Sequence, residues 1–221
     1  MSGLKEQPTG TLKRLELIKY FAFCKSYYEN SDYDSEFKEV MFEEMLYIAR
    51  YINQLKYLFH KSEFGGDTER DILYRILALT KSFECCKFVF KNAYFNVELK
   101  ELAFKKMTKT ANSYRNWKFV YANAGIDEKL KFRAIRNMAK KAKSFNEWKL
   151  IYIEALDKKI INVAMKKLAE TAKRFKHWAF IHKEVPYSCE LSGKSLFCMV
   201  EMTETSYQNR YISQVLRESQ F

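Results

Sequence analysis

Apolar and aromatic residues recur along this chain at a nearly constant step. The steps between the marked positions are 31, 31, 31, 31 and 30 residues. A Phe, Ile or Tyr stands three residues before each marked position, and a Tyr, Leu, Val or Ile stands three residues after it. An internal period of this length is typical of repeat proteins. The marked positions are Cys24, Leu55, Cys86, Trp117, Trp148 and Trp178.

The first half of each repeat has the pattern of an amphipathic helix. In residues 144–174 the apolar positions fall at i, i+3, i+6, i+7 and i+10, which places them on one helical stripe. Ser144 precedes the stripe, and Ser82 and Ser113 hold the same place in their units. Serine is favoured at a helix N-cap because its hydroxyl accepts from an unpaired backbone N–H. The stripe consists of Phe145, Trp148, Ile151, Tyr152 and Ala155.

A short break and a second helix complete the unit. We expect the break at residues 156–159, and at residues 125–127 in the preceding unit. Gly125 suits a position that needs positive φ, and Asp127 suits the next N-cap. The inner face of the second helix reads Ala164, Leu168 and Ala172. The matching triplets in the two preceding units are Ala134, Met138 and Ala142, then Ala103, Met107 and Ala111.

These patterns predict an all-α fold. We expect a right-handed α-solenoid of about six helix pairs of roughly 31 residues, spanning residues 11–183. Residues 1–10 are polar and are expected to form a disordered tail. After Pro186 the pattern is lost, and residues 184–221 are expected to form a C-terminal cap. Tyr207, Tyr211 and Val215 predict a final amphipathic helix that covers the last repeat, as solenoids require for solubility.

The repeat resembles the α-helical tandem repeats of the HEAT and tetratricopeptide kind over about four-fifths of the chain. The resemblance rests on the length of the helix pair and on the run Trp148-x-x-Ile151-Tyr152. It departs from the tetratricopeptide signature in its shorter period, in the Ile-Tyr or Val-Tyr that replaces Leu-Gly, and in lacking the closing Pro. Families of this class imply a superhelical scaffold with a concave binding face.

Positive charge is concentrated in the later repeats. The formal net charge of the chain is +12. Residues 1–100 carry 15 Lys and Arg and 15 Asp and Glu, whereas residues 101–183 carry 21 and 7, and residues 184–221 carry 3 and 5. A basic block of this density indicates binding to nucleic acid or to an acidic protein surface. The alternative is a solvated lysine-rich surface without a ligand.

The outward stripe of the second helices is the candidate binding face. Stacked repeats would arrange its cations as a grid that faces phosphates or an acidic surface. The three tryptophans could instead stack on bases, but their apolar neighbours favour a core position for Trp117, Trp148 and Trp178. The candidate binding residues are Lys105, Lys109, Arg136, Lys140, Lys143, Lys166 and Lys173.

Signals for catalysis are weak. No histidine stands at a metal-ligand spacing, Cys85 and Cys86 are adjacent rather than in a CxxC motif, and no dinucleotide fingerprint occurs. We therefore expect no catalytic residues, no metal and no cofactor. The enzymatic alternative is a HEAT-like DNA glycosylase, which resembles this chain in size, helicity and charge but needs a carboxylate beside exposed aromatics in its groove.

The expected partner is a macromolecule, either a protein or a nucleic acid. No stretch approaches eighteen consecutive apolar residues, so no membrane association is expected. The chain has five cysteines, an odd number, and they are irregularly spaced. Two of them occupy the apolar repeat position, where a thiol behaves as a small apolar side chain. This usage favours a reducing, intracellular setting, with the protein in the cytoplasm.

Overall fold

The computed structural model describes residues 14–30, 32–62, 66–94, 96–186 and 190–218. The predicted tail at residues 1–10 lies outside this part of the chain. The described residues form thirteen helices and no strand, which confirms the all-α prediction. The helices are α1 (Arg14–Glu29), α2 (Ser35–Ile48), α3 (Ile52–Lys61), α4 (Asp67–Leu79), α5 (Phe83–Asn92), α6 (Val97–Thr110), α7 (Tyr114–Ala122), α8 (Glu128–Ala139), α9 (Phe145–Glu154), α10 (Lys158–Thr171), α11 (Phe175–Glu184), α12 (Glu190–Glu201) and α13 (Ser206–Glu218).

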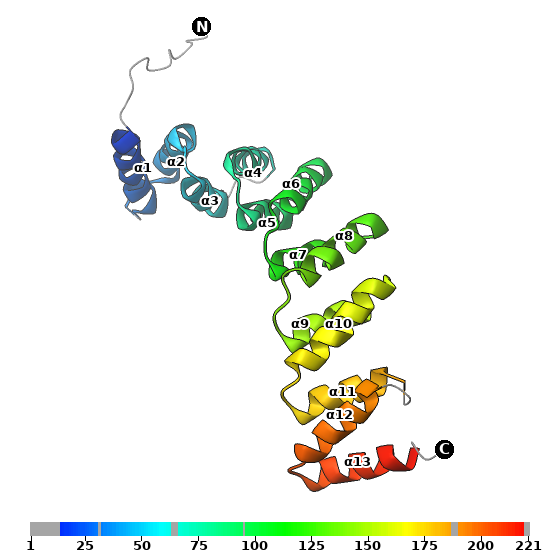
Figure 1. The fold of residues 1–221 in the computed structure, drawn as a ribbon. Helices are drawn as coiled ribbons and strands as arrows, with labels where there is room; N and C mark the ends of the chain where they lie inside the picture. The colour runs from blue at the N-terminus through cyan, green and yellow to red at the C-terminus, as the bar shows by residue number, and fades with distance from the viewer. Residues whose placement is uncertain (1–13, 31, 63–65, 95, 187–189, 219–221) are drawn as a thin grey trace. The chain divides into compact units, whose positions relative to one another are not determined.

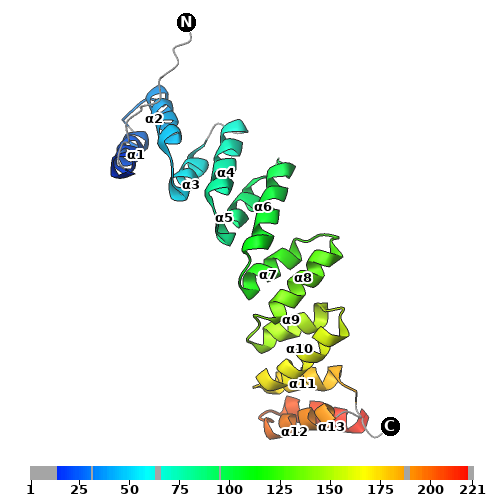
Figure 2. The same ribbon diagram turned by 45° about the horizontal axis from the view of Figure 1, so that its top comes forward.

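The chain divides into two compact units, Met1–Thr110 and Ala111–Phe221. In the first unit α1 packs on α2, α3 on α4 and α5 on α6; in the second α7 packs on α8, α9 on α10 and α11 on α12 (Figures 1 and 2). Consecutive helices therefore pair as the sequence predicts. We call the first helix of each pair helix A and the second helix B.

Local sequence signals fix the helix starts. Ser144 caps α9 in a capping box with Glu147, and Ser113 accepts a hydrogen bond from the Asn116 amide at 3.2 Å. Asp127 caps α8 by accepting from the Leu130 amide at 2.9 Å. Ser82 occupies the N-cap of α5 without a side-chain cap bond.

The break between α9 and α10 lies slightly earlier than the sequence predicts. It comprises residues 155–157, since α10 begins at Lys158. The reason is Asp157, whose carboxylate accepts from the Lys159 amide at 2.7 Å and so caps the helix one residue before it begins. In the preceding turn Gly125 adopts φ +57°, the left-handed conformation expected for it.

The core of the second unit follows the repeat register. Trp117, Trp148 and Trp178 expose only 5–6% of their surface. Opposite them, the second helices bury Ala134 and Met138 on α8 and Ala164 and Leu168 on α10 completely. Small and medium residues on helix B thus leave room for the large rings of helix A.

The third residue of each predicted inner triplet is not part of the helical face. Ala142 lies in the turn beyond α8, Ala172 is the C-cap of α10, and both are partly exposed. The same holds for Ala111, which follows the end of α6. The helices end earlier than the apolar spacing suggests because the next helix A must start within a few residues.

Helix α12 is absent from the sequence prediction, which treated residues 184–221 only as a cap. It packs on α11 and completes a further pair. Its inner face reads Ser192, Ser195 and Met199, all buried. The Ser195 hydroxyl lies 3.0 Å from Nδ1 of the buried His182 and donates to the Ser192 carbonyl at 2.7 Å. Buried polar groups are stable when hydrogen-bonded, and this serine pair interrupts the apolar stripe by which the helix would have been found.

The final helix, α13, forms as predicted, but only part of its predicted apolar face is buried. Tyr207 is 76% exposed, whereas Ile212 and Val215 are buried. Tyr211 is half-buried and packs edge-on against Phe175, with ring centroids 5.9 Å apart.

Hydrogen bonds from tyrosine hydroxyls, which we call tyrosine clasps, join successive helix pairs within each unit. The Tyr121 hydroxyl of α7 donates to Oε2 of Glu154 on α9 at 2.5 Å. The Tyr152 hydroxyl of α9 reaches Glu184 of α11 at 3.3 Å in the same way. In the first unit the Tyr28 hydroxyl donates to the Lys61 carbonyl at 3.3 Å. These bonds join α1 to α3, α7 to α9 and α9 to α11.

The clasp at Tyr121 predicts a loss of stability at alkaline pH. The hydrogen bond to Glu154, with partial burial and the charge of that carboxylate, raises the pKa of Tyr121 to about 12. Because the unfolded pKa is about 10, the clasp stabilises the fold fully below pH 10 and ceases to do so as the pH rises through about 12. The free energy of unfolding in urea should therefore fall more steeply with pH over that interval for the wild type than for Tyr121→Phe. At pH 8 the variant should be about 1 kcal/mol less stable. Parallel pH profiles of the two proteins would contradict the assignment.

Candidate functional site

Most of the excess positive charge belongs to the second unit. Residues 111–221 contain 21 Lys and Arg and 11 Asp and Glu, whereas residues 1–110 contain 18 and 16. The basic block found in the sequence therefore lies mainly on α7 to α11. A candidate binding surface is best sought within this unit.

All seven candidate cations are exposed, but they do not form a single helical face. Four lie on B helices, one is a C-cap, and two lie in the turns that lead from helix B to the next helix A. Lys105 and Lys109 lie on α6, Arg136 on α8 and Lys166 on α10, Lys140 is the C-cap of α8, and Lys143 and Lys173 lie in turns. The expected grid along the second helices is therefore wrong for Lys140, Lys143 and Lys173, because α8 and α10 end before them.

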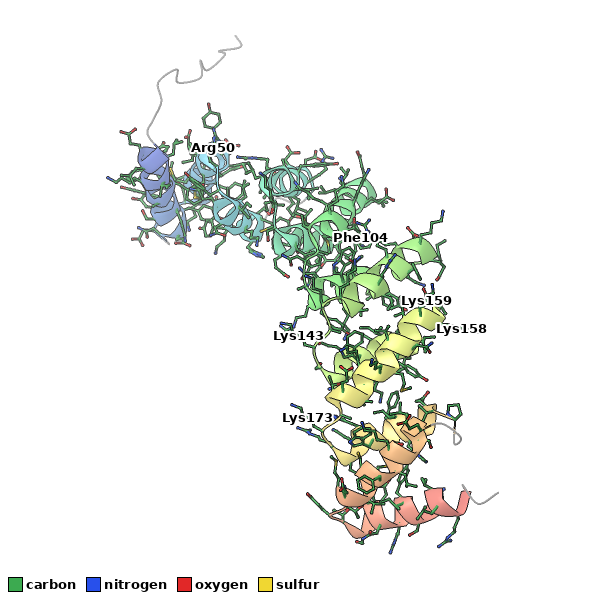
Figure 3. All side chains as sticks on the ribbon, in the orientation of Figure 1. Arg50, Phe104, Lys143, Lys158, Lys159 and Lys173 are labelled. Carbon is green, nitrogen blue, oxygen red and sulfur yellow. The ribbon has the colours of Figure 1, made fainter. Side chains whose placement is uncertain are left out.

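At two successive connections of the second unit, three exposed cations lie in or directly beside the turn that leads from helix B to helix A, and we call these six residues the basic edge. Figure 3 shows Lys143 and Lys173 at the same edge of the unit, with Lys158 and Lys159 at the other end of α10. Lys141, Arg174 and Lys176 belong to the edge and were missed in the sequence, where only helical spacing was considered. The basic edge consists of Lys140, Lys141 and Lys143, then Lys173, Arg174 and Lys176.

The side chains of the basic edge are available to an external anion. In the described part of the second unit, ion pairs join Lys131 to Glu128 at 3.1 Å and Lys167 to Glu170 at 2.5 Å, and none involves the basic edge. In the first unit Arg50 stands in the turn between α2 and α3, but its guanidinium donates to the Tyr47 carbonyl at 2.8 Å. The side chains of the basic edge have no comparable partner among the described residues.

The two turns differ in the group that caps the following helix. At α9 the Glu147 carboxylate accepts from the Lys143 amide at 2.7 Å. At α11 the corresponding acceptor is Nδ1 of His177, 3.2 Å from the Lys173 amide. An imidazole in place of a carboxylate removes one negative charge from the cap, while Glu201 and Glu204 line the same hollow as the cations of the second turn.

The pKa of His177 reflects the potential of this turn. Burial lowers the pKa of His177, and the nearby charges of Lys176, Arg174 and Lys149 lower it further. The ring also stacks on Phe145, with centroids 3.9 Å apart. Neutral His177 can accept a hydrogen bond from the Lys173 amide, so the capping group adds no charge to this turn.

The described residues provide no metal site at this surface, and its one strongly exposed aromatic ring is Tyr207, which lines a hollow with Lys173 and Arg174. In the described residues no group of His, Cys, Asp and Glu is arranged to hold a metal ion. The tryptophans are buried and so cannot stack on a ligand. The run Gly193-Lys194-Ser195, whose order resembles the end of a phosphate-binding loop, lies inside α12 and forms no loop. None of the described helices is long and apolar enough to cross a membrane.

Comparisons with protein-family models, with curated proteins and with solved structures give no match to this chain.

Proposed function

We propose that this protein is a non-enzymatic binding scaffold whose basic edge engages the phosphate backbone of nucleic acid. The observation that carries the proposal is the pair of cation clusters at two successive turns, without ion-pair partners in the described residues. Arg136 and Lys166 add charge on the adjoining helices α8 and α10. Lys105 and Lys109 are cations of the same kind on α6 of the first unit.

The composition of the surface favours backbone contacts over base recognition. Five of the six residues of the basic edge are lysines, whose ammonium groups act as point charges toward phosphates. A regular polyanion suits a cation cluster that recurs once per helix pair. Binding of this kind releases counterions, so it depends strongly on salt and little on sequence.

The scaffold itself is proposed to be a right-handed α-solenoid of about six helix pairs of roughly 31 residues, of the HEAT and tetratricopeptide kind. Recurring contacts within the units support this. Tyr121 and Tyr152 each clasp the next helix A. The Gln208 side chain of α13 accepts hydrogen bonds from the Glu204 and Thr205 amides at 2.8 and 3.0 Å. The Glu147 side chain of α9 accepts from the Lys143 amide just before its helix in the same way.

Two alternatives remain distinct from this proposal. An acidic protein surface could occupy the basic edge, since carboxylates and phosphates attract the same cations. A DNA glycosylase would need a carboxylate beside an accessible base pocket. Glu154 lines a cavity, but its Oε2 accepts from Tyr121 and the cavity lies away from the basic edge. The proposal therefore assigns no catalytic residue, and it places the protein inside the cell with its ligand.

Fluorescence anisotropy with labelled duplex DNA tests the partner class. Two duplexes of equal length and unrelated sequence should bind with similar affinity. Raising the salt concentration from about 50 to 200 mM should weaken both by at least ten-fold. Poly-L-glutamate of equal charge should displace the duplex poorly. If poly-L-glutamate binds more tightly than the duplex, the partner is an acidic protein surface and the nucleic-acid proposal fails.

A further inference from the structure

A second concave surface in the same unit has a different character. A cavity of about 270 Å³ lies between the α7/α8 pair and the α9/α10 pair, at the turns that lead from helix A to helix B. Its lining includes Ile135 and Ala155, which are buried, and Phe132, Ile153 and Leu156, which are exposed. It therefore offers an apolar floor and an open apolar rim.

The exposure of these apolar side chains has no explanation in the fold itself. Ile126 is 98% exposed, Leu156 is 84% exposed and Ile153 is 58% exposed. Ile126 and Leu156 each precede an N-cap aspartate, where an apolar residue commonly packs on the first turns of the helix. Exposures this high exclude that packing. Ile153 and Leu156 line the cavity together with Phe132, and exposed apolar side chains gathered at one place are characteristic of an interaction site.

The charged groups around the cavity are mainly acidic, although the unit is basic. Glu128, Glu154 and Asp157 line it, with Lys131 as the single cation in the lining. Lys131 pairs with Glu128 at 3.1 Å, which leaves two carboxylates without a cation in the lining. Tyr121 fixes Glu154 by donating to Oε2 at 2.5 Å, while Oε1 can accept from a ligand. A cation of a partner would meet carboxylates that are already oriented.

We propose that this cavity binds a segment of a partner protein that carries one large apolar side chain next to a lysine or arginine. The apolar side chain lies against Phe132, Ile153 and Leu156, and the neighbouring cation pairs with Glu154 or Asp157. The volume of the cavity, about 270 Å³, accommodates one large apolar side chain. The scaffold would then hold a protein partner at this cavity and a polyanion at the basic edge. The inference does not depend on the proposed nucleic-acid binding.

Methyl NMR on the full chain tests the inference with short blocked peptides. The probe is Ala-Lys-Leu-Lys-Ala, with Ala-Glu-Leu-Glu-Ala and Ala-Lys-Ala-Lys-Ala as matched controls for charge and for the apolar side chain. Only the first peptide should shift the methyl signals of Ile153, Leu156 and Ile160 at millimolar concentration. Leu156→Ala should weaken that binding about ten-fold. Val163→Ala, on α10 outside the cavity, should leave it unchanged.

Three results would overturn the inference. One is the absence of any shift with the first peptide at millimolar concentration. Another is an equal shift with all three peptides. The third is movement of the same signals when the protein alone is diluted, because that would show a second copy of the chain in the cavity. Reversing the charges of the basic edge should not affect peptide binding, so failure of the proposed function remains distinguishable from failure here.

Discussion

Replacing Trp148 by alanine is expected to lower the free energy of unfolding of the second unit by about 3–5 kcal/mol. The Trp148 ring is 5% exposed and packs in the register shared by Trp117 and Trp178. Its removal loses the transfer free energy of a large side chain and leaves a cavity that the helix pairs cannot close fully. This is the largest effect on stability that we expect from a single change in this unit.

Tryptophan fluorescence during urea unfolding measures this effect in the right unit. All three tryptophans lie in the second unit, so Trp117 and Trp178 still report its unfolding in the variant. Leu156→Ala, at an 84% exposed position, is the matched control and should change stability by less than about 0.5 kcal/mol. A loss below about 1 kcal/mol for Trp148→Ala would mean that the ring does not support the core.

Reversing the charge of Arg136, Lys140 and Lys143 to glutamate is expected to weaken binding to duplex DNA by about 100-fold at low salt. The change removes three cations and adds three anions on the same surface, so attraction to phosphates is replaced by repulsion. All three side chains are exposed and none has an ion-pair partner in the described residues. The fold should therefore be retained, which circular dichroism would verify.

A matched variant separates the position of the charges from their number. Lys19, Lys61 and Lys91 lie on exposed positions of the first unit, and their reversal to glutamate changes the net charge by the same amount. This variant should lose much less affinity than the first. Equal losses would mean that the net charge of the chain attracts DNA and that the basic edge has no special role.

The helical part of the fold could be predicted because its signals are local. The register of Trp117, Trp148 and Trp178 identifies helix A, and Ser144 and Asp127 mark helix starts by hydrogen bonds within a few residues. The division into two units could not be read from such signals, since a repeat in the sequence does not say where packing is divided.

Helix α12 shows where apolar periodicity stops being informative. Ser195 and Met199 follow Ala164 and Leu168 by the usual step of 31 residues, so a search by register could have found the helix. Ser192 and Ser195 are buried against His182, and a polar pair that satisfies its own hydrogen bonds has no apolar signature.

The sequence predicted which part of the chain carries the candidate cations, but it predicted only some of their positions on the helices. The excess of lysine located the unit, but the assumed length of α8 and α10 placed Lys143 and Lys173 on helices that end before them. The cavity beside Leu156 had no sequence signal, because Leu156 before Asp157 looks like ordinary helix capping.

The salt dependence of duplex binding, measured for the wild type and for the variant with Arg136, Lys140 and Lys143 reversed, tests the central claim most directly. Each phosphate contact contributes about 0.9 to the slope of log K against log salt concentration for duplex DNA. The account predicts a steep negative slope for the wild type and a slope smaller in magnitude by about 3 for the variant. Identical slopes for the two proteins, or wild-type binding that does not change with salt, would contradict the assignment of the basic edge as a nucleic-acid-binding surface.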